Sequence, residues 1–305
     1  MNESVTLMEV SPRDGLQNES TQLSTQDKLT LLDHALDAGF TRIEVASFVH
    51  PTRVPQMADA EAVCASLPKR ADVTYTGLVL NWRGYERALA TGTIDEIGMV
   101  VSASDAFGQK NQGQTVEEGL AAGREILADA KRRGIKAQVT IAVSFGCPFE
   151  GEVEIGRVVE IATRLAEAGP VEIALADTIG VGVPTRVMAA FDAVREVVGA
   201  EMPLRAHFHD TRNTGIANAF AAMQVGVDTL DASIGGIGGC PFAPNATGNI
   251  ATEDLVYMLD RMQVAHDVSL ERLLTASRWL SGALGKTLPS MVSRAGGFPV
   301  GDGHR

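Results

Sequence analysis

Stretches with apolar residues at helical spacing alternate along the chain with short runs of apolar and β-branched residues. Many of the helical stretches end in glycine, as in "LDAGFTRIEVAS", "KRRGIKAQVTIAV" and "AEAGPVEIALAD". A glycine after a helix is typical of a C-cap, and the run that follows it is typical of a strand. The runs predict eight strands, near residues 5–10, 41–47, 73–79, 96–102, 137–143, 171–176, 203–208 and 228–233.

Eight strand–helix units predict an α/β protein with the (β/α)8 TIM barrel fold, which needs ~250 residues. One predicted helix covers residues 24–38, and Ser24 with Asp27 resembles a helix start. The alternative, an open doubly wound sheet, calls for a Gly-rich fingerprint after the first strand, where this chain has "SPRDGLQ". We expect residues 1–305 to form one domain, with residues 266–305 as extra C-terminal helices and a flexible tail.

Composition narrows the classes of partner. The chain has 305 residues, 45% of them hydrophobic, and neither a spanning apolar run nor a signal peptide is recognisable, so we expect a cytoplasmic protein with no membrane partner. Its three cysteines include no CxxC pair, which argues against a disulfide framework. A net charge of −12 argues against a nucleic-acid partner, and a polyanionic ligand would need a local cluster of cations.

Polar residues gather where the predicted strands end, the edge that carries the chemistry in such barrels. Burying them is costly unless they pair with each other or bind a metal. They are Glu9, Arg13, Asp14, Gln17, Glu44, Ser47, Ser102, Asp177, His207, His209 and Asp210.

The stretch "RAHFHDT" places His207 and His209 on alternate positions of the seventh strand. Alternate strand residues point to the same face, so both imidazoles can converge on one ion, whereas a lone histidine would more simply be a packed one. Two imidazoles and a carboxylate are a common divalent-metal set, and Asp14 is the carboxylate we select. Oxygens from Asn249 and water would complete a site for Mg²⁺ or Mn²⁺, with Co²⁺ or Zn²⁺ as substitutes.

The stretch "GGIGGCPFAPNATGN", residues 235–249, lacks the phosphate-binding GxxxxGK[ST] pattern. It is typical of a mobile loop that closes over a barrel mouth. Cys240 lies in this loop, and it is either a functional group facing the site or an inert thiol.

Two long strings, "EVSPRDGLQNE" at 9–19 and "GGCPFAPNATGNIATEDLVYML" at 238–259, resemble the signatures of 3-hydroxy-3-methylglutaryl-CoA lyase. That family belongs to the barrel metallolyases, with isopropylmalate and homocitrate synthases. The strings "IEVASFVHP", "GCPFEGE", "DTIGVGVP" and "HFHDT" follow in the expected order, so the resemblance covers about residues 5–290. It implies a carbon–carbon lyase of leucine degradation that cleaves 3-hydroxy-3-methylglutaryl-CoA to acetyl-CoA and acetoacetate.

The resemblance also implies site residues. Metal ligation falls on Asp14, His207, His209 and Asn249, and catalysis on Arg13, Glu44, Asp177 and Cys240. In a retro-Claisen step, Arg13 would stabilise the enolate oxygen and Cys240 would protonate the carbon. Asp177 would take or relay the hydroxyl proton, although positioning is an equal alternative for Asp177 and Glu44. In "FGQKNQ", Lys110 and Asn111 are expected to contact CoA, while Gln109 replaces a second basic residue common in the family.

Departures from the family pattern at Ser11, Arg212 and Asn245 keep related substrates open, namely 3-hydroxy-3-acylglutaryl-CoA or citramalyl-CoA. A Claisen-type synthase of the same superfamily is a further alternative, but synthases often carry "RDGEQ", where this chain has Leu16. A non-haem iron oxygenase would use the same ligands, and a non-catalytic CoA-binding or metal-binding protein would show no turnover. We expect a homo-oligomer, most simply a dimer.

Overall fold

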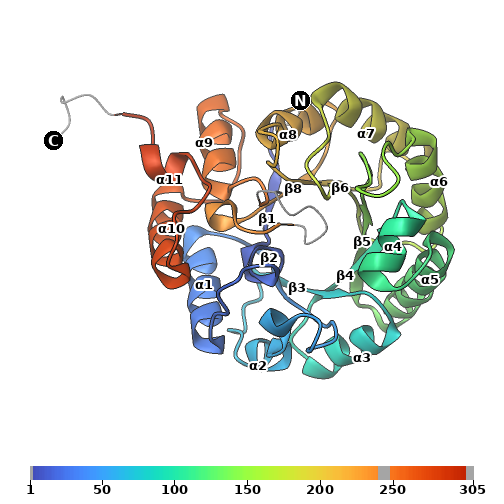
Figure 1. The fold of residues 1–305 in the computed structure, drawn as a ribbon, viewed down its shortest axis with the longest axis horizontal. Coiled ribbons are helices and arrows are strands. Elements are labelled where there is room, and N and C mark those ends of the chain that lie inside the picture. Colours follow the sequence, from blue (N-terminus) through green and yellow to red (C-terminus); the bar gives the residue numbers. More distant parts are fainter. Residues whose placement is uncertain (1–2, 240–247, 300–305) are drawn as a thin grey trace.

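The computed structural model describes residues 3–239 and 248–299. Within them, parallel strands close into a barrel in the order β1 to β8, with β8 paired to β1, which confirms the predicted (β/α)8 fold (Figure 1). The eight strands all overlap predicted ones. They are β1 (Thr6–Glu9), β2 (Arg42–Ser47), β3 (Thr74–Val79), β4 (Glu96–Ser102), β5 (Lys136–Ala142), β6 (Ile173–Asp177), β7 (Leu204–Phe208) and β8 (Thr229–Ala232).

Helices cover the outside of the barrel, and their ends follow local rules. The helix start predicted at Ser24 is a capping box, in which the Ser24 side chain accepts from the Asp27 amide and the Asp27 carboxylate accepts from the Ser24 amide. At the other end of the same helix, Gly39 adopts a φ of 105°, which other residues rarely adopt. The surrounding helices are α1 (Thr25–Ala38), α2 (Ala60–Ala65), α3 (Trp82–Thr91), α4 (Asp105–Gln112), α5 (Val116–Arg133), α6 (Ile155–Ala166), α7 (Pro184–Val198) and α8 (Gly215–Gln224).

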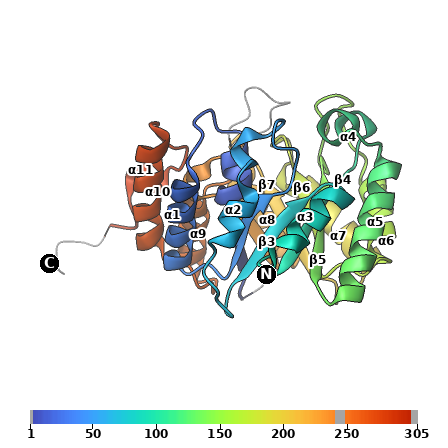
Figure 2. The same ribbon diagram turned by 90° about the horizontal axis from the view of Figure 1, so that it is seen from below.

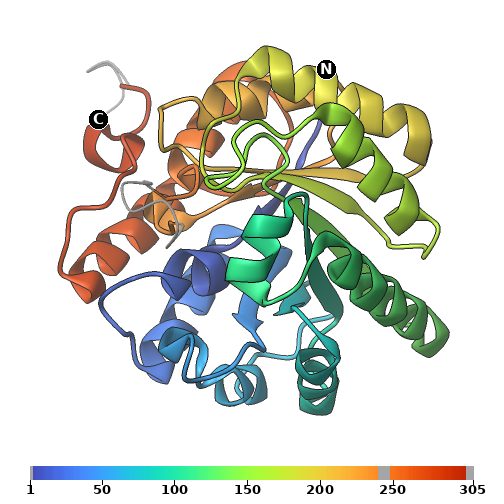
Figure 3. The same ribbon diagram turned by 45° about the vertical axis from the view of Figure 1, so that its right-hand side comes forward.

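The predicted C-terminal helices are present as α9 (Thr252–Met262), α10 (Leu270–Leu284) and α11 (Val292–Ala295). Helix α10 packs against α1 and α9, on the outside of the ring (Figures 1 and 3). Residues 300–305 of the predicted tail lie outside the described residues. Among the described helices, none combines the length and apolar character that crossing a membrane requires.

Charged side chains fill part of the barrel interior, where branched apolar residues usually dominate. Arg42 of β2 reaches across the barrel to Glu172, at 2.9 and 2.8 Å, and also pairs with Glu96. Glu172 in turn accepts from Nε of Arg205 on β7, at 2.9 Å. Arg205 also donates to Asp231 of β8. This buried chain of ion pairs leads through the barrel toward the C-terminal ends of the strands, the end where α4 also lies (Figure 2).

Candidate metal centre and active site

Asp14 reaches the barrel mouth through a short π-helix, η1 (Ser11–Gly15), that follows β1. Pro12 stands in the first turn of η1, where its missing amide hydrogen costs nothing. Gly15 closes the turn against the opposite loop, because a Cβ there would lie 2.8 Å from Ile237. The tight turn therefore fixes Arg13 and Asp14 side by side, with Nη1 of Arg13 donating to Oδ1 of Asp14 at 2.5 Å.

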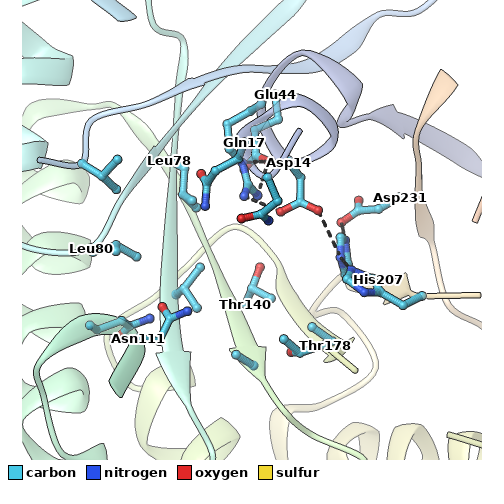
Figure 4. Close-up of a pocket in the computed structure, with 18 of the residues that line it drawn as sticks. Asp14, Gln17, Glu44, Leu78, Leu80, Asn111, Thr140, Thr178, His207 and Asp231 are labelled. Atoms are coloured by element: carbon cyan, nitrogen blue, oxygen red, sulfur yellow. Dashed lines mark hydrogen bonds and ion pairs between the residues drawn. The ribbon is translucent and has the colours of Figure 1, made fainter. Parts of the chain in front are cut away.

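His207 and His209 converge as their alternation predicted. Their Nε2 atoms are 3.2 Å apart, and Nε2 of His207 lies 3.9 Å from Oδ2 of Asp14 (Figure 4). One ligand atom from each of the three residues lies within 4.8 Å of the others. Two ligand atoms bonded at a right angle to one ion of Mg²⁺ size are about 3 Å apart, so the spacing of the imidazoles suits a shared divalent ion.

Asn249, the fourth predicted ligand, is held beside the histidines by backbone pairing. It forms an isolated β-bridge with His209, and its Nδ2 donates to Oδ2 of Asp14 at 2.9 Å. The loop backbone approaches closely here, since a Cβ on Gly238 would lie 2.5 Å from Nδ2 of Asn249. A Cβ on Gly248 would collide with the carbonyl oxygens of Gly236 and Gly238. Glycines on both sides of Asn249 thus allow its side chain to enter the site.

The site leaves polar atoms buried without partners. Among the described residues, Nδ1 of His209 and Oδ1 of Asn249 have no hydrogen-bond partner although both are buried. Such atoms are costly unless something else satisfies them. Together with the oxygen and nitrogen donors that already converge, Oδ1 of Asn249 fits a divalent cation, which would be held by Asp14, His207 and His209, with Asn249 as a further oxygen ligand.

The charge states of Asp14 and His209 suit metal binding, whereas the raised pKa of His207 favours its protonated form. Burial favours the neutral acid of Asp14, but the charges of Arg13 and the two histidines and the hydrogen bond from Asn249 together outweigh burial and hold the pKa of Asp14 well below its usual range. Burial, aided by the neighbouring His207, lowers the pKa of His209 to about 4, so its imidazole is neutral near pH 7. Burial also acts to lower the pKa of His207, yet its hydrogen bond to Asp231 and the charge of Asp14 raise it above the usual value.

Arg13 is anchored by the predicted site carboxylate of β2. Its Nε donates to Oε2 of Glu44 at 2.5 Å, and only 9% of the surface of Arg13 is exposed. Burial raises the pKa of Glu44, against the opposing effect of the Arg13 charge. The permanent cation is therefore held beside the candidate metal ligands, where it lines the cavity.

Asp231 is a site residue that the sequence analysis missed. Its Oδ2 accepts from Nδ1 of His207 at 3.0 Å and also from Arg205 (Figure 4). This hydrogen bond places the imidazole proton on Nδ1 and leaves the lone pair of Nε2 free for an ion. Asp231 stands two residues after Thr229 in a short strand that is otherwise apolar, and this polar alternation was the sign in the sequence that could have identified it.

Two further residues predicted to be catalytic are Asp177 and Cys240. Asp177 ends β6, and both of its oxygens accept backbone amides of the following loop, from Val181 and Gly182 at 2.9 Å each. It does not line the cavity. Burial raises the pKa of its carboxyl group. Cys240 lies outside the described residues.

The two residues expected to contact CoA differ in position. Asn111 lines the cavity, whereas the ammonium of Lys110 lies 3.8 Å from the centre of the Phe149 ring. The aromatic ring already stabilises this cation.

Glu9, another polar residue at a strand end, does not line the cavity. It is fully buried and accepts from the amides of Ser11 and Ile234 and the hydroxyl of Thr252. Burial raises the pKa of Glu9 to about 7. Nearby Glu253, also buried, accepts from the Gly235 amide, and burial raises its pKa to about 8. These acids hold the loop after β8 in place.

The cavity at this mouth has a volume of about 150 Å³. Polar groups form one side of it, around Asp14, His207 and Asp231, and apolar groups such as Leu78 and Leu80 lie on the other side (Figure 4). A substrate bound there would meet the candidate ion and the guanidinium of Arg13.

A (β/α)8 barrel with a two-histidine, one-carboxylate site and a buried arginine at its mouth defines a class of metal-dependent barrel enzymes. The chain belongs to the HMGL-like family, whose model matches residues 4–280. It is 43% identical over 304 residues to the (R)-citramalyl-CoA lyase of Chloroflexus aurantiacus, covering 96% of this chain and 95% of that protein. It is 41% identical over 286 residues to the hydroxymethylglutaryl-CoA lyase YngG of Bacillus subtilis, covering 94% and 95%.

Solved structures agree. A hydroxymethylglutaryl-CoA lyase from Acinetobacter baumannii, in complex with coenzyme A and 3-methylmalate, superposes with a TM-score of 0.93 at 37% identity and covers 98% of each chain. The predicted family and the predicted enzyme class, a carbon–carbon lyase, are thereby confirmed.

Proposed function

We propose that the protein cleaves 3-hydroxy-3-methylglutaryl-CoA to acetyl-CoA and acetoacetate in a metal-dependent retro-Claisen reaction. The observation that carries this proposal is the convergence of Asp14, His207 and His209 within 4.8 Å, beside the buried guanidinium of Arg13. The cleavage of a tertiary alcohol next to a thioester needs two electrophilic groups close together, and this mouth provides places for both.

A divalent ion on these ligands would acidify the hydroxyl group of the substrate. Arg13 stabilises the enolate oxygen that develops on the thioester as the carbon–carbon bond breaks, because its charge is permanent and fixed before the reaction begins. Glu44 positions Arg13 through their ion pair. Mg²⁺ or Mn²⁺ matches the mixture of oxygen and nitrogen donors.

The remaining roles rest on the family resemblance and on local contacts. We assign Asp177 to positioning, since both of its oxygens hold the amides of the loop after β6. Cys240 is the proposed donor of the proton that converts the enolate into the acetyl group, since a thiol pKa near 8.5 suits that step. Replacing Cys240 with serine should lower kcat without loss of the fold, and an unchanged rate would remove the thiol from the reaction.

We also propose that the whole chain forms a single domain and that the protein is a homodimer. We further propose that it is cytoplasmic and acts in leucine degradation. The packing of α10 against α1 and α9 supports the single domain. The other three have support only from the sequence and its resemblance.

The test is turnover by purified protein that has been stripped of metal and refilled with one ion at a time. With Mg²⁺ or Mn²⁺, 3-hydroxy-3-methylglutaryl-CoA should yield equal amounts of acetyl-CoA and acetoacetate, including under strict exclusion of oxygen. Thiol release from acetyl-CoA and a 2-oxo acid, without cleavage of the hydroxyacyl thioester, would identify a synthase instead.

A second candidate substrate is citramalyl-CoA, because a relative that carries this activity in its name is 43% identical over nearly the whole chain. Citramalyl-CoA has its carboxylate on the hydroxyl-bearing carbon itself, so its chain is one methylene shorter and its cleavage yields pyruvate. Comparing kcat/KM for the two thioesters, with acetoacetate and pyruvate measured separately, decides between them.

A further inference from the structure

Two threonines in the wall of the catalytic cavity carry hydroxyl hydrogens that no described residue accepts. Thr140 lies on β5, Thr178 directly follows β6, and both half-buried side chains line the cavity. They lie on the opposite side of the cavity from Glu44, the carboxylate that anchors Arg13 (Figure 4). The proposed reaction gives neither threonine a role.

The partner of Thr140, Arg205, fixes the direction of the hydrogen bond between them. Nη2 of Arg205 lies 2.9 Å from Oγ1 of Thr140, and a guanidinium can only donate, so the threonine oxygen accepts. The hydroxyl hydrogen of Thr140 is then left for a group bound in the cavity. A hydroxyl that accepts from a cation is also polarised by it, which strengthens the bond that it donates.

Arg205 lines the same cavity but has little left to offer a substrate. Its Nη2 also donates to Gln138 at 2.7 Å, its Nε donates to Glu172 at 2.9 Å, and its Nη1 donates to Asp231. The two carboxylates balance its charge. Arg205 is therefore a positioning residue, which occupies the oxygen of Thr140 and leaves the hydroxyl hydrogen to the cavity.

The same arrangement recurs at Thr178, and a third donor lines the same cavity. The amide of Val143 donates to Oγ1 of Thr178 at 2.9 Å, so this hydroxyl also keeps its hydrogen for another acceptor. Val143 has a φ of 53°, which β-branched residues rarely adopt, and backbone strain of this kind clusters at functional sites. Gln112 of α4 lines the cavity too, and its Nε2 is buried without a partner among the described residues. Donors without acceptors call for a ligand group that only accepts.

An ionised carboxylate accepts hydrogen bonds and donates none. We propose that Thr140 is a specificity-determining residue, which donates its hydroxyl hydrogen to the free carboxylate of the acyl group. This inference rests on the proposed function, because it takes the substrate to be a hydroxyacyl thioester with such a carboxylate. The candidate ion meets the hydroxyl group of that substrate and Arg13 meets the thioester, so the carboxylate is the oxygen-bearing group that remains for this wall. A thioester without the carboxylate leaves these donors unpaired and binds less tightly.

The experiment uses two thioesters that lack the hydroxyl group and so cannot undergo the cleavage. They are 3-methylglutaryl-CoA and 3-methylbutanoyl-CoA, and the second has a hydrogen where the first has its carboxylate. Calorimetry on Mn²⁺-loaded protein gives a Kd for each, and the ratio of the two Kd values is the carboxylate preference. Wild-type protein should bind 3-methylglutaryl-CoA more tightly. Thr140→Val removes the hydroxyl at nearly constant shape and should lower this preference by roughly tenfold or more, whereas Thr140→Ser should retain most of it.

The matched control is Thr229→Val. Thr229 is buried in the same chain of ion pairs, where its hydroxyl donates to Glu172 at 2.8 Å, but it does not line the cavity. Thr229→Val should keep the wild-type preference, which separates a lost cavity donor from a disturbed barrel interior.

Four results would overturn the proposal: wild-type protein without the preference, an unchanged preference in Thr140→Val, an equal loss of affinity for both thioesters in that variant, or the same loss of preference in Thr229→Val. Cleavage of 3-hydroxy-3-methylglutaryl-CoA is measured separately. A carboxylate preference that depends on Thr140, in a protein that does not cleave this thioester, would support the proposal and refute the proposed function.

Discussion

Replacing Asp231 with asparagine tests how the barrel prepares a metal ligand. The carboxylate accepts from Nδ1 of His207 at 3.0 Å and also holds Arg205. Asparagine has nearly the same shape but carries no charge, and an amide hydrogen facing Nδ1 would favour the tautomer that has its proton on Nε2. That tautomer has no lone pair to offer an ion on the side where His209 and Asp14 converge.

The expected loss is ~10–100-fold in affinity for Mn²⁺, the usual effect of removing the partner of a ligating histidine. This corresponds to about 1.4–2.7 kcal/mol. The fold should survive, because Arg205 keeps Glu172 at 2.9 Å and Gln138 at 2.7 Å as partners. The loss of stability should therefore stay below the ~3–5 kcal/mol typical of a fully broken buried pair.

The assay is titration of the metal-free protein with Mn²⁺, followed by the signal of the free ion in electron paramagnetic resonance. The matched control is Asp228→Asn, which also removes a carboxylate that pairs with an arginine, Arg195, at 3.3 Å. Asp228 lies just before the first residue of β8, whereas Asp231 lies within the strand. Asp228→Asn should keep the wild-type affinity. If Asp231→Asn binds Mn²⁺ as tightly as wild type, the carboxylate does not prepare His207 and the reasoning is refuted.

Three further variants have definite expected outcomes. Arg13→Met should reduce kcat by ~10²–10³-fold or more while Mn²⁺ still binds, and loss of the circular dichroism spectrum would instead mark Arg13 as structural. Gly248→Ala should weaken Mn²⁺ binding, because its Cβ collides with the carbonyls of Gly236 and Gly238 and displaces Asn249; unaltered binding would exclude Asn249 as a ligand. Glu253→Gln should stabilise the protein at pH 9 more than at pH 5, as measured by urea unfolding. Burial raises the Glu253 pKa to about 8, so between pH 4.5 and 8 the folded state keeps a proton that the unfolded state releases, and wild-type stability falls by at most roughly 1.4 kcal/mol per pH unit, whereas glutamine cannot ionise. Parallel unfolding curves for both proteins at both pH values would contradict this.

Much of the architecture could be predicted from local patterns. The glycine that ends a helix and the apolar run behind it are set within a few residues, which explains why eight strands and the helix start at Ser24 were found. The alternation of His207 and His209 is also local, and barrel geometry then brings Asp14 to them from the other end of the sequence.

Local sequence patterns could not predict contacts between strands that are distant in the sequence. Asp231 and Arg205 belong to a chain of ion pairs across the barrel, and the spacing of these residues in the sequence does not predict that chain. Lys110 resembles a phosphate ligand in sequence, but its cation lies over an aromatic ring that arrives from another loop. Asp177 was predicted to stand at a strand end and does, yet whether its oxygens face the cavity or the loop amides depends on the backbone path after β6.

The most direct test of the central claim is a crystal structure of the protein grown with Mn²⁺, with diffraction recorded so that the anomalous signal of manganese locates the ion. We expect one strong peak at the barrel mouth, within ~2.0–2.3 Å of a carboxylate oxygen of Asp14 and of one ring nitrogen from each of His207 and His209. Well-ordered side chains at this mouth with no peak between them, or a peak bound by other residues, would contradict the account.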